Sequence, residues 1–90
     1  ALPGAMLDAF MDGLSEAFGK NLLRVKGLVM LAERPQTPVA VHLVQGIRQP
    51  LQPLAHWPDG AATTRLVMIA EDIPEAALIA YCSAFMTAAV

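Results

Sequence analysis

The chain has 90 residues, of which 56% are hydrophobic and 16% are charged, and its formal net charge is −2. This length supports one domain around one core, and no clustered basic patch is present to bind nucleic acid. A single cysteine excludes an internal disulfide and is typical of a reducing cytoplasm, and no apolar run reaches the ~20 residues that span a bilayer. The apolar excess predicts that another domain or subunit covers part of the surface.

The N-terminal part of the chain predicts a short linker and then a helix. Residues 1–4 are typical of a linker, and we expect them to be the remnant of a connection to an upstream domain. Residues 5–18 carry apolar side chains at helical spacing. Asp8, Asp12 and Glu16 lie at i,i+4 spacing on the polar side, where we expect a solvated stripe.

Two alternating segments then predict a β-hairpin. Residues 22–32 alternate between two faces. One face carries Gly27 and four apolar side chains, and the other begins with the cations Arg24 and Lys26. Residues 33–38 contain two prolines, which cannot continue a ladder, so we expect a turn there. Residues 39–45 alternate again and should pair back on the first strand. The face with Gly27 carries Leu23, Val25, Val29 and Leu31.

Residues 46–64 are rich in proline and predict a loop, with a short edge strand near residues 51–54. Residues 64–70 are the most strand-like segment of the chain. The last element is a helix, because Asp72 lies three residues before Glu75 at capping-box spacing and Pro74 suits a first turn.

The predicted order is therefore α-β-β-(β)-β-α. Strands grouped between two helices indicate an α+β fold, with an antiparallel sheet of three to four strands and two helices packed on one face.

The other face of such a sheet would be open. A half-polar, half-apolar open face differs from an ordinary solvated surface, and each large apolar side chain left in water forgoes about 1.5–3 kcal/mol. We therefore predict a docking face, although the loop 47–63 folding over it is an alternative. Depending on the register in which residues 64–70 pair, Val67 and Ile69 also lie on this face. Its predicted members are Arg24, Lys26, Leu28, Met30, His42, Val44 and Arg65.

The sequence contains no motif for catalysis. Gly19-Lys20-Asn21 closes a predicted helix, whereas the Lys of a phosphate-binding loop opens one. Ser15 and Ser83 lie within predicted helices and not on the exposed elbows that nucleophiles occupy. We therefore predict no catalytic residue and no nucleotide binding by this chain itself.

Metal binding has weak support. His42, His56 and Cys82 are the strong nitrogen and sulfur donors, and none lies two to five residues from another. We predict no metal site within the chain and keep His42 and His56 as weak candidates. Cys82 lies on an apolar helical stripe, which predicts a small buried side chain.

Five motifs in order resemble the C-terminal domain of the CobW family. The segment Leu23-Arg24-Val25-Lys26-Gly27, after an acidic helix, is similar to the Leu-Arg-x-Lys-Gly strand of that family. Ala70 departs from the pattern, since glycine is common there. The resemblance spans residues 5–87, and its other motifs are Val44-Gln45-Gly46, Trp57-Pro58, Arg65-Leu66-Val67-Met68-Ile69 and Asp72-Ile73-Pro74-Glu75.

The resemblance implies a non-catalytic interaction or regulatory domain of a GTPase that serves metal delivery or cobalamin biosynthesis. CobW-like proteins carry an N-terminal P-loop GTPase domain with a Cys-x-Cys-Cys motif, so the implied partners are that domain and a metalloprotein or cobaltochelatase client. GTP, magnesium and zinc or cobalt would belong to the parent protein. The alternative is a small metal-binding domain in which His42 or His56 contributes to a site shared with the GTPase domain. The oligomeric state stays open.

Overall fold

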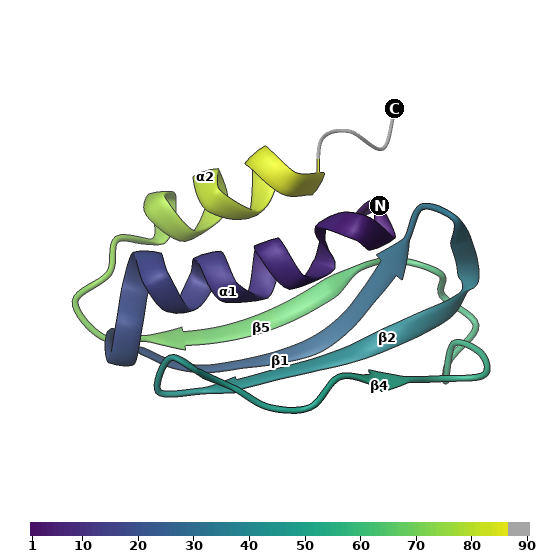
Figure 1. The fold of residues 1–90 in the computed structure, drawn as a ribbon, viewed down its shortest axis with the longest axis horizontal. Helices are drawn as coiled ribbons and strands as arrows, with labels where there is room; N and C mark the ends of the chain where they lie inside the picture. The colour runs from purple at the N-terminus through teal and green to yellow at the C-terminus, as the bar shows by residue number, and fades with distance from the viewer. Residues whose placement is uncertain (87–90) are drawn as a thin grey trace.

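A computed structural model describes residues 1–86 of the chain (Figure 1). The two helices lie on the same side of one antiparallel sheet, whose strand order is β3-β2-β1-β5, with β4 also paired to β2. This confirms the predicted α+β fold. The elements are α1 (Leu7–Phe18), β1 (Leu22–Leu31), β2 (Arg34–Val44), β3 (Ile47–Arg48), β4 (Gln52–Pro53), β5 (Arg65–Ala70) and α2 (Glu75–Met86).

The β1–β2 hairpin forms as predicted, but its turn is shorter than expected. β2 already begins at Arg34, and Leu31 of β1 lies opposite this residue. Val29 lies opposite Val39, so the register shifts over the stretch that contains both prolines. A β-bulge or similar irregularity tolerates a residue without an N–H group. The expected turn over residues 33–38 was therefore wrong.

A second register shift corrects the predicted first face of β1. The pairing with β5 shifts between Leu22 and Arg24, so Leu22 turns into the core and Leu23 is only half-buried. Gly27 keeps its predicted place on the helix side, opposite Leu66 of β5. A Cβ at this position would collide with the backbone of β5, so glycine permits the close approach of the two strands.

The loop after β2 extends the sheet at its edge. The backbone N–H of Gln49 donates to the His42 carbonyl at 3.0 Å, and the backbone N–H of Leu54 donates to the Pro38 carbonyl at 2.9 Å. This segment therefore runs along β2, and the short edge strand predicted within it is β4. The alternative in which this part of the loop folds across the open face is wrong.

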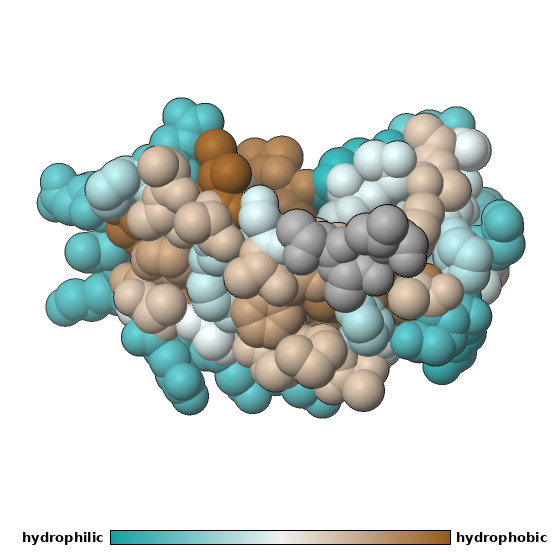
Figure 2. Space-filling view, turned by 90° about the horizontal axis from the view of Figure 1, so that it is seen from above, coloured by the Kyte–Doolittle hydropathy of each residue, from teal (hydrophilic) through white to brown (hydrophobic). Residues whose placement is uncertain are grey.

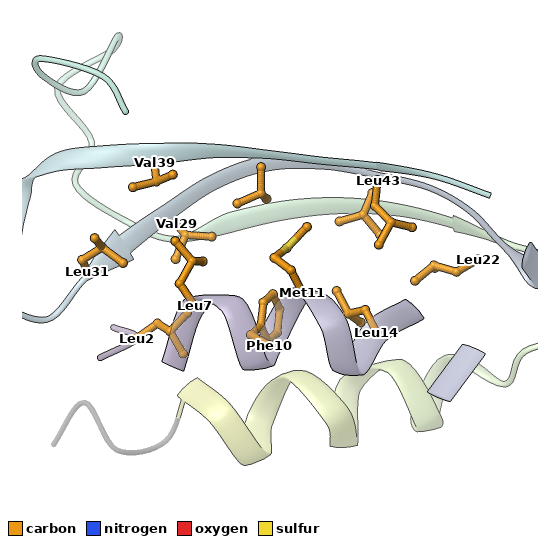
Figure 3. Close-up of a cluster of buried hydrophobic side chains, with 12 residues drawn as sticks. Leu2, Leu7, Phe10, Met11, Leu14, Leu22, Val29, Leu31, Val39 and Leu43 are labelled. Carbon is orange, nitrogen blue, oxygen red and sulfur yellow. The ribbon is translucent and has the colours of Figure 1, made fainter. Parts of the chain in front are cut away.

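The core lies between α1 and the sheet (Figure 3). The apolar side of α1 faces the helix-side residues of β1 and β2, as the spacing of both segments predicts. Burial of such side chains contributes about 1.5–3 kcal/mol each. The buried cluster comprises Leu2, Leu7, Phe10, Met11, Leu14, Leu22, Val25, Val29, Leu31, Val39, Val41 and Leu43.

Leu2 is part of this core, although residues 1–4 were expected to be a linker remnant. Its side chain is fully buried, and its amide donates to the Met30 carbonyl at 2.9 Å. Its carbonyl accepts from the Ala32 amide at 2.8 Å. This segment therefore belongs to the folded domain, and a connection to an upstream domain stays a prediction.

The acidic side of α1 is not simply solvated. Arg48 of β3 donates to Asp8 at 2.9 Å and to Asp12 at 2.8 Å. Hydrogen bonds to Asp12 and then to Asp8 raise the pKa of Arg48 above its usual value. The stripe is exposed as expected, with the side chains of Asp8 and Asp12 at 78% and 58%, and these two carboxylates also connect the helix to the edge of the sheet.

α2 packs on α1 through aromatic side chains. The ring of Phe10 lies 5.7 Å from that of Tyr81 and 5.3 Å from that of Phe85, measured between centroids. The Tyr81 hydroxyl donates to the Phe10 carbonyl at 2.8 Å, and burial raises the pKa of Tyr81 to about 12. Gly13 leaves room for this hydroxyl, because a Cβ there would overlap it.

The start of α2 differs from the predicted capping box. Asp72 has a φ of 59° and lies in a left-handed turn, and the helix begins at Glu75. The Pro74 carbonyl accepts from the Ala77 and Leu78 amides. A residue that precedes proline is disfavoured in helical conformation, so the helix cannot begin as early as Asp72 would require.

We expect Gly13→Ala to destabilise the domain, although alanine favours a helix by about 1 kcal/mol over glycine. The reason is overlap with the Tyr81 hydroxyl. In a Tyr81→Phe background the same change should become neutral or stabilising. Urea unfolding of the wild type, the two single variants and the double variant measures the coupling free energy between the two positions. We expect it to reach about 1 kcal/mol or more. Additive effects would contradict the contact.

A candidate docking face

The face of the sheet opposite the helices carries the predicted docking residues in three cross-strand rows. Residues directly opposite in an antiparallel pair lie on the same face. The register therefore aligns Val44, Arg24 and Ile69 in one row, His42, Lys26 and Val67 in the next, and Ala40, Leu28 and Arg65 in the third. Met30 follows beyond the third row and is half-buried.

Apolar side chains on this face are strongly exposed. Val67 is 68% exposed and Ile69 is 51% exposed. Ile47 of β3 lies opposite Val44 and so extends the first row, with 66% exposure. The sequence did not assign Ile47 to this face, because the register of a short edge strand depends on the course of its loop.

The two cations in the middle of the face have no acidic partner among residues 1–86. Arg24 and Lys26 are exposed, and neither forms an ion pair with any described residue. Each has aliphatic neighbours in its own row, Ile69 beside Arg24 and Val67 beside Lys26. The face therefore combines positive charge with exposed apolar area.

Arg65 has a different environment from the other two cations. Its guanidinium donates to Asp59 at 2.8 Å and lies 5.5 Å from the centre of the Trp57 ring. Trp57 is buried, and its Nε1 donates to the Pro35 carbonyl at 2.7 Å. The ion pair with Arg65 lowers the pKa of Asp59. These contacts fix the segment before β5 at one end of the face.

Two hollows flank the centre of the face. One, of about 500 Å³, lies over β1 and β5 and includes Arg24, Lys26 and Val67. The other, of about 540 Å³, is bounded by β1, β2 and the side chains of Gln49 and Gln52. Leu28 lines both hollows, so a partner could insert side chains on either side of it.

The weak metal candidates do not form a ligand set. His42 lies in the middle row next to Lys26, while His56 lies in the loop beside Trp57, with Nδ1 3.3 Å from its carbonyl oxygen. Within residues 1–86, no group of three or more His, Cys, Asp or Glu side chains could hold a metal ion. The His42 Nε2 atom is enclosed and has no hydrogen-bond partner among these residues. Cys82 is half-buried, and burial raises the pKa of its thiol.

A family model decides the relationship of this chain to known proteins. The model of the "Cobalamin synthesis protein cobW C-terminal domain" matches residues 2–85. The chain belongs to the CobW C-terminal domain family. The match includes all five strands, and it therefore contains the three rows of the docking face. Searches of curated proteins and of solved structures found no match.

Neither helix of this CobW C-terminal domain is long and apolar enough to cross a membrane, as far as residues 1–86 show. The family and the fold support the prediction of a domain without catalytic activity of its own.

We expect the two faces of the sheet to respond differently to the same substitution. Val41→Ala removes a side chain that is 2% exposed and should lower the free energy of unfolding by roughly 1.5–3 kcal/mol. Val67→Ala should lower it by no more than about 1 kcal/mol, the range of β-propensity. Chemical denaturation measures both. Equal losses would place Val67 in the core.

Proposed function

We propose that this CobW C-terminal domain is a non-catalytic interaction domain, and that its open sheet face docks the GTPase domain of the same protein. The observation that carries the proposal is the exposure of Ile47, Val67 and Ile69 around two cations, Arg24 and Lys26, that form no ion pair within residues 1–86. Water covers this apolar area in the isolated domain, and a docked partner would remove it from water.

The chemistry of the face specifies the partner surface. Arg24 and Lys26 lie near the middle of the rows. The complementary surface of the partner should therefore place carboxylates opposite these two cations, with apolar side chains around the carboxylates. The two hollows beside Leu28 would receive the larger side chains. Such a surface is expected on the GTPase domain, which we propose as the first partner, and a metalloprotein or cobaltochelatase client is the second.

The metal and nucleotide chemistry is assigned to the rest of the parent protein. We propose that GTP, magnesium and zinc or cobalt bind a GTPase domain that lies upstream in the same protein. The role of the present domain is then to hold that domain or its client in one orientation. This places the protein in metal delivery or cobalamin biosynthesis, and we propose a cytoplasmic location for it.

The docking proposal predicts which substitutions weaken binding. Titration calorimetry of the 90-residue chain with the separately produced GTPase domain should give measurable affinity. Ile47→Lys should weaken this affinity at least about tenfold, because a charge replaces buried apolar area. Arg24→Glu should do the same and reduce the salt dependence of binding.

Ile79→Lys is the matched control for docking. Ile79 is 56% exposed, close to the value for Ile47, but it lies on α2 on the other side of the sheet. Its substitution should leave the affinity within about twofold of wild type. Equal losses for the two lysine variants, or no binding by the wild-type chain, would contradict docking through the open face.

The Nε2 atom of His42, which is enclosed and has no hydrogen-bond partner within residues 1–86, favours a second candidate, a metal site completed by ligands from the GTPase domain. Zinc titration distinguishes the two proposals. The isolated chain should bind zinc weakly, because residues 1–86 lack a group of three ligands. Submicromolar affinity that is lost in His42→Ala would contradict the first proposal and support the metal site.

A further inference from the structure

Strand β5 forms a free edge of the sheet. Within residues 1–86 it pairs with β1 alone, so one row of its backbone N–H and C=O groups points away from the sheet. After Arg65 the strand contains only apolar residues and no proline. Edge strands usually carry charges or prolines that prevent pairing with another strand, and β5 has neither in its centre.

The helix above this edge is also incompletely covered. α2 has one charged residue, Glu75, among its twelve, and helices that are apolar all round are usually buried. A groove of about 610 Å³ separates it from β5, with Leu66 and Met68 on one side and Ile79 and Cys82 on the other. Figure 2 shows a largely apolar centre on the side of the molecule that carries α2, with hydrophilic residues around its periphery.

A partner that covers this region pairs a strand with β5 and places apolar side chains beside α2, and a second copy of this chain can supply both. The residues of β5 also form a self-complementary pattern. Arg65, Val67 and Ile69 lie on the open face, and the alternation carried one residue further adds Glu71, whose amide donates to the Asn21 carbonyl. The pattern therefore begins with a cation and ends with an anion.

Symmetry and charge select one register for this pairing. In an antiparallel pair, directly opposite residues lie on the same face of the sheet. The helices of two copies therefore lie on the same side of the joined sheet only if one residue of β5 lies opposite the same residue of the second copy, with the twofold axis between them. An axis at Met68 places Arg65 opposite Glu71 and Val67 opposite Ile69 of the second copy. An axis at Val67 would place Arg65 opposite Ile69, without a charge partner.

We propose that this domain forms a twofold-symmetric dimer in which the β5 strands pair antiparallel about Met68. Arg65 can also contact Glu71 of the second copy. Its guanidinium has five N–H donors, and within the chain it donates to Asp59 and to the Ala61 carbonyl, so further donors stay available. The grooves beneath the two α2 helices then face each other and bury Ile79. The dimer leaves the open faces free side by side, so it is independent of the docking proposal.

Sedimentation velocity of the 90-residue chain, between about 5 and 500 µM, tests the association. We expect a dimer with a dissociation constant in the micromolar to submillimolar range, since pairing of six residues and one helix contact make a small interface. Ile79→Lys and Glu71→Lys should each weaken it at least about tenfold. Ile47→Lys, on the far edge, and Glu16→Lys, on α1, should change it less than about twofold.

Cysteine cross-linking tests the register in a Cys82→Ala background. Directly opposite side chains have Cβ atoms about 4.5–5.5 Å apart, close enough for a disulfide after small adjustments. Met68→Cys should form covalent dimers under mild oxidation, whereas Leu66→Cys and Val67→Cys should form them at least about tenfold more slowly. Circular dichroism of each variant verifies that the fold is retained.

Two results would overturn the proposal. One is a wild-type chain that stays monomeric over the whole concentration range. The other is a dimer with different contacts, shown either by its persistence in Ile79→Lys or by cross-linking through Val67→Cys and not through Met68→Cys. Because docking is sensitive to Ile47 and dimerisation to Ile79, the failure of one proposal is distinguishable from the failure of the other.

Discussion

The packing of α1 on the β1–β2 hairpin is the contact on which the other elements depend. It places the apolar side of α1 against one face of the sheet and buries Phe10, Met11 and Leu14 completely. α2 then packs largely on α1, through the rings of Tyr81 and Phe85 around Phe10. Because both helices occupy one side, nothing in residues 1–86 covers the other side of the sheet, and its side chains are available to a partner.

Two surfaces of this CobW C-terminal domain are incompletely covered, and they differ in kind. The open face combines the exposed cations Arg24 and Lys26 with exposed aliphatic side chains, which suits a partner with acidic and apolar groups. The β5 edge and α2 offer backbone groups and apolar side chains in a pattern that suits a copy of itself. The two surfaces meet at β5, but the edge would use its backbone groups and the helix side, while the open face uses side chains on the other side of the sheet, so binding at one leaves the other accessible.

Much of the fold was predictable from the sequence because periodicity reports burial. The alternation of β1 and β2 predicted their hairpin and their two faces, and helical spacing predicted α1 and α2. The errors have physical causes. The register shift between β1 and β2 lets β2 include prolines that the sequence assigned to a turn, and Pro74 prevented the capping box that Asp72 and Glu75 suggested.

The sequence by itself determined both helices, the β1–β2 hairpin with most of the alternation of its two faces, and the motifs that indicate the CobW family. Only the tertiary structure decided that Ile47 joins the open face, that Asp8 and Asp12 bind Arg48, and that Leu2 enters the core. Periodicity records which side of a segment is buried, but not which segments become neighbours. Those three features depend on register and on contacts between distant parts of the chain, which form only when the sheet and α1 are assembled.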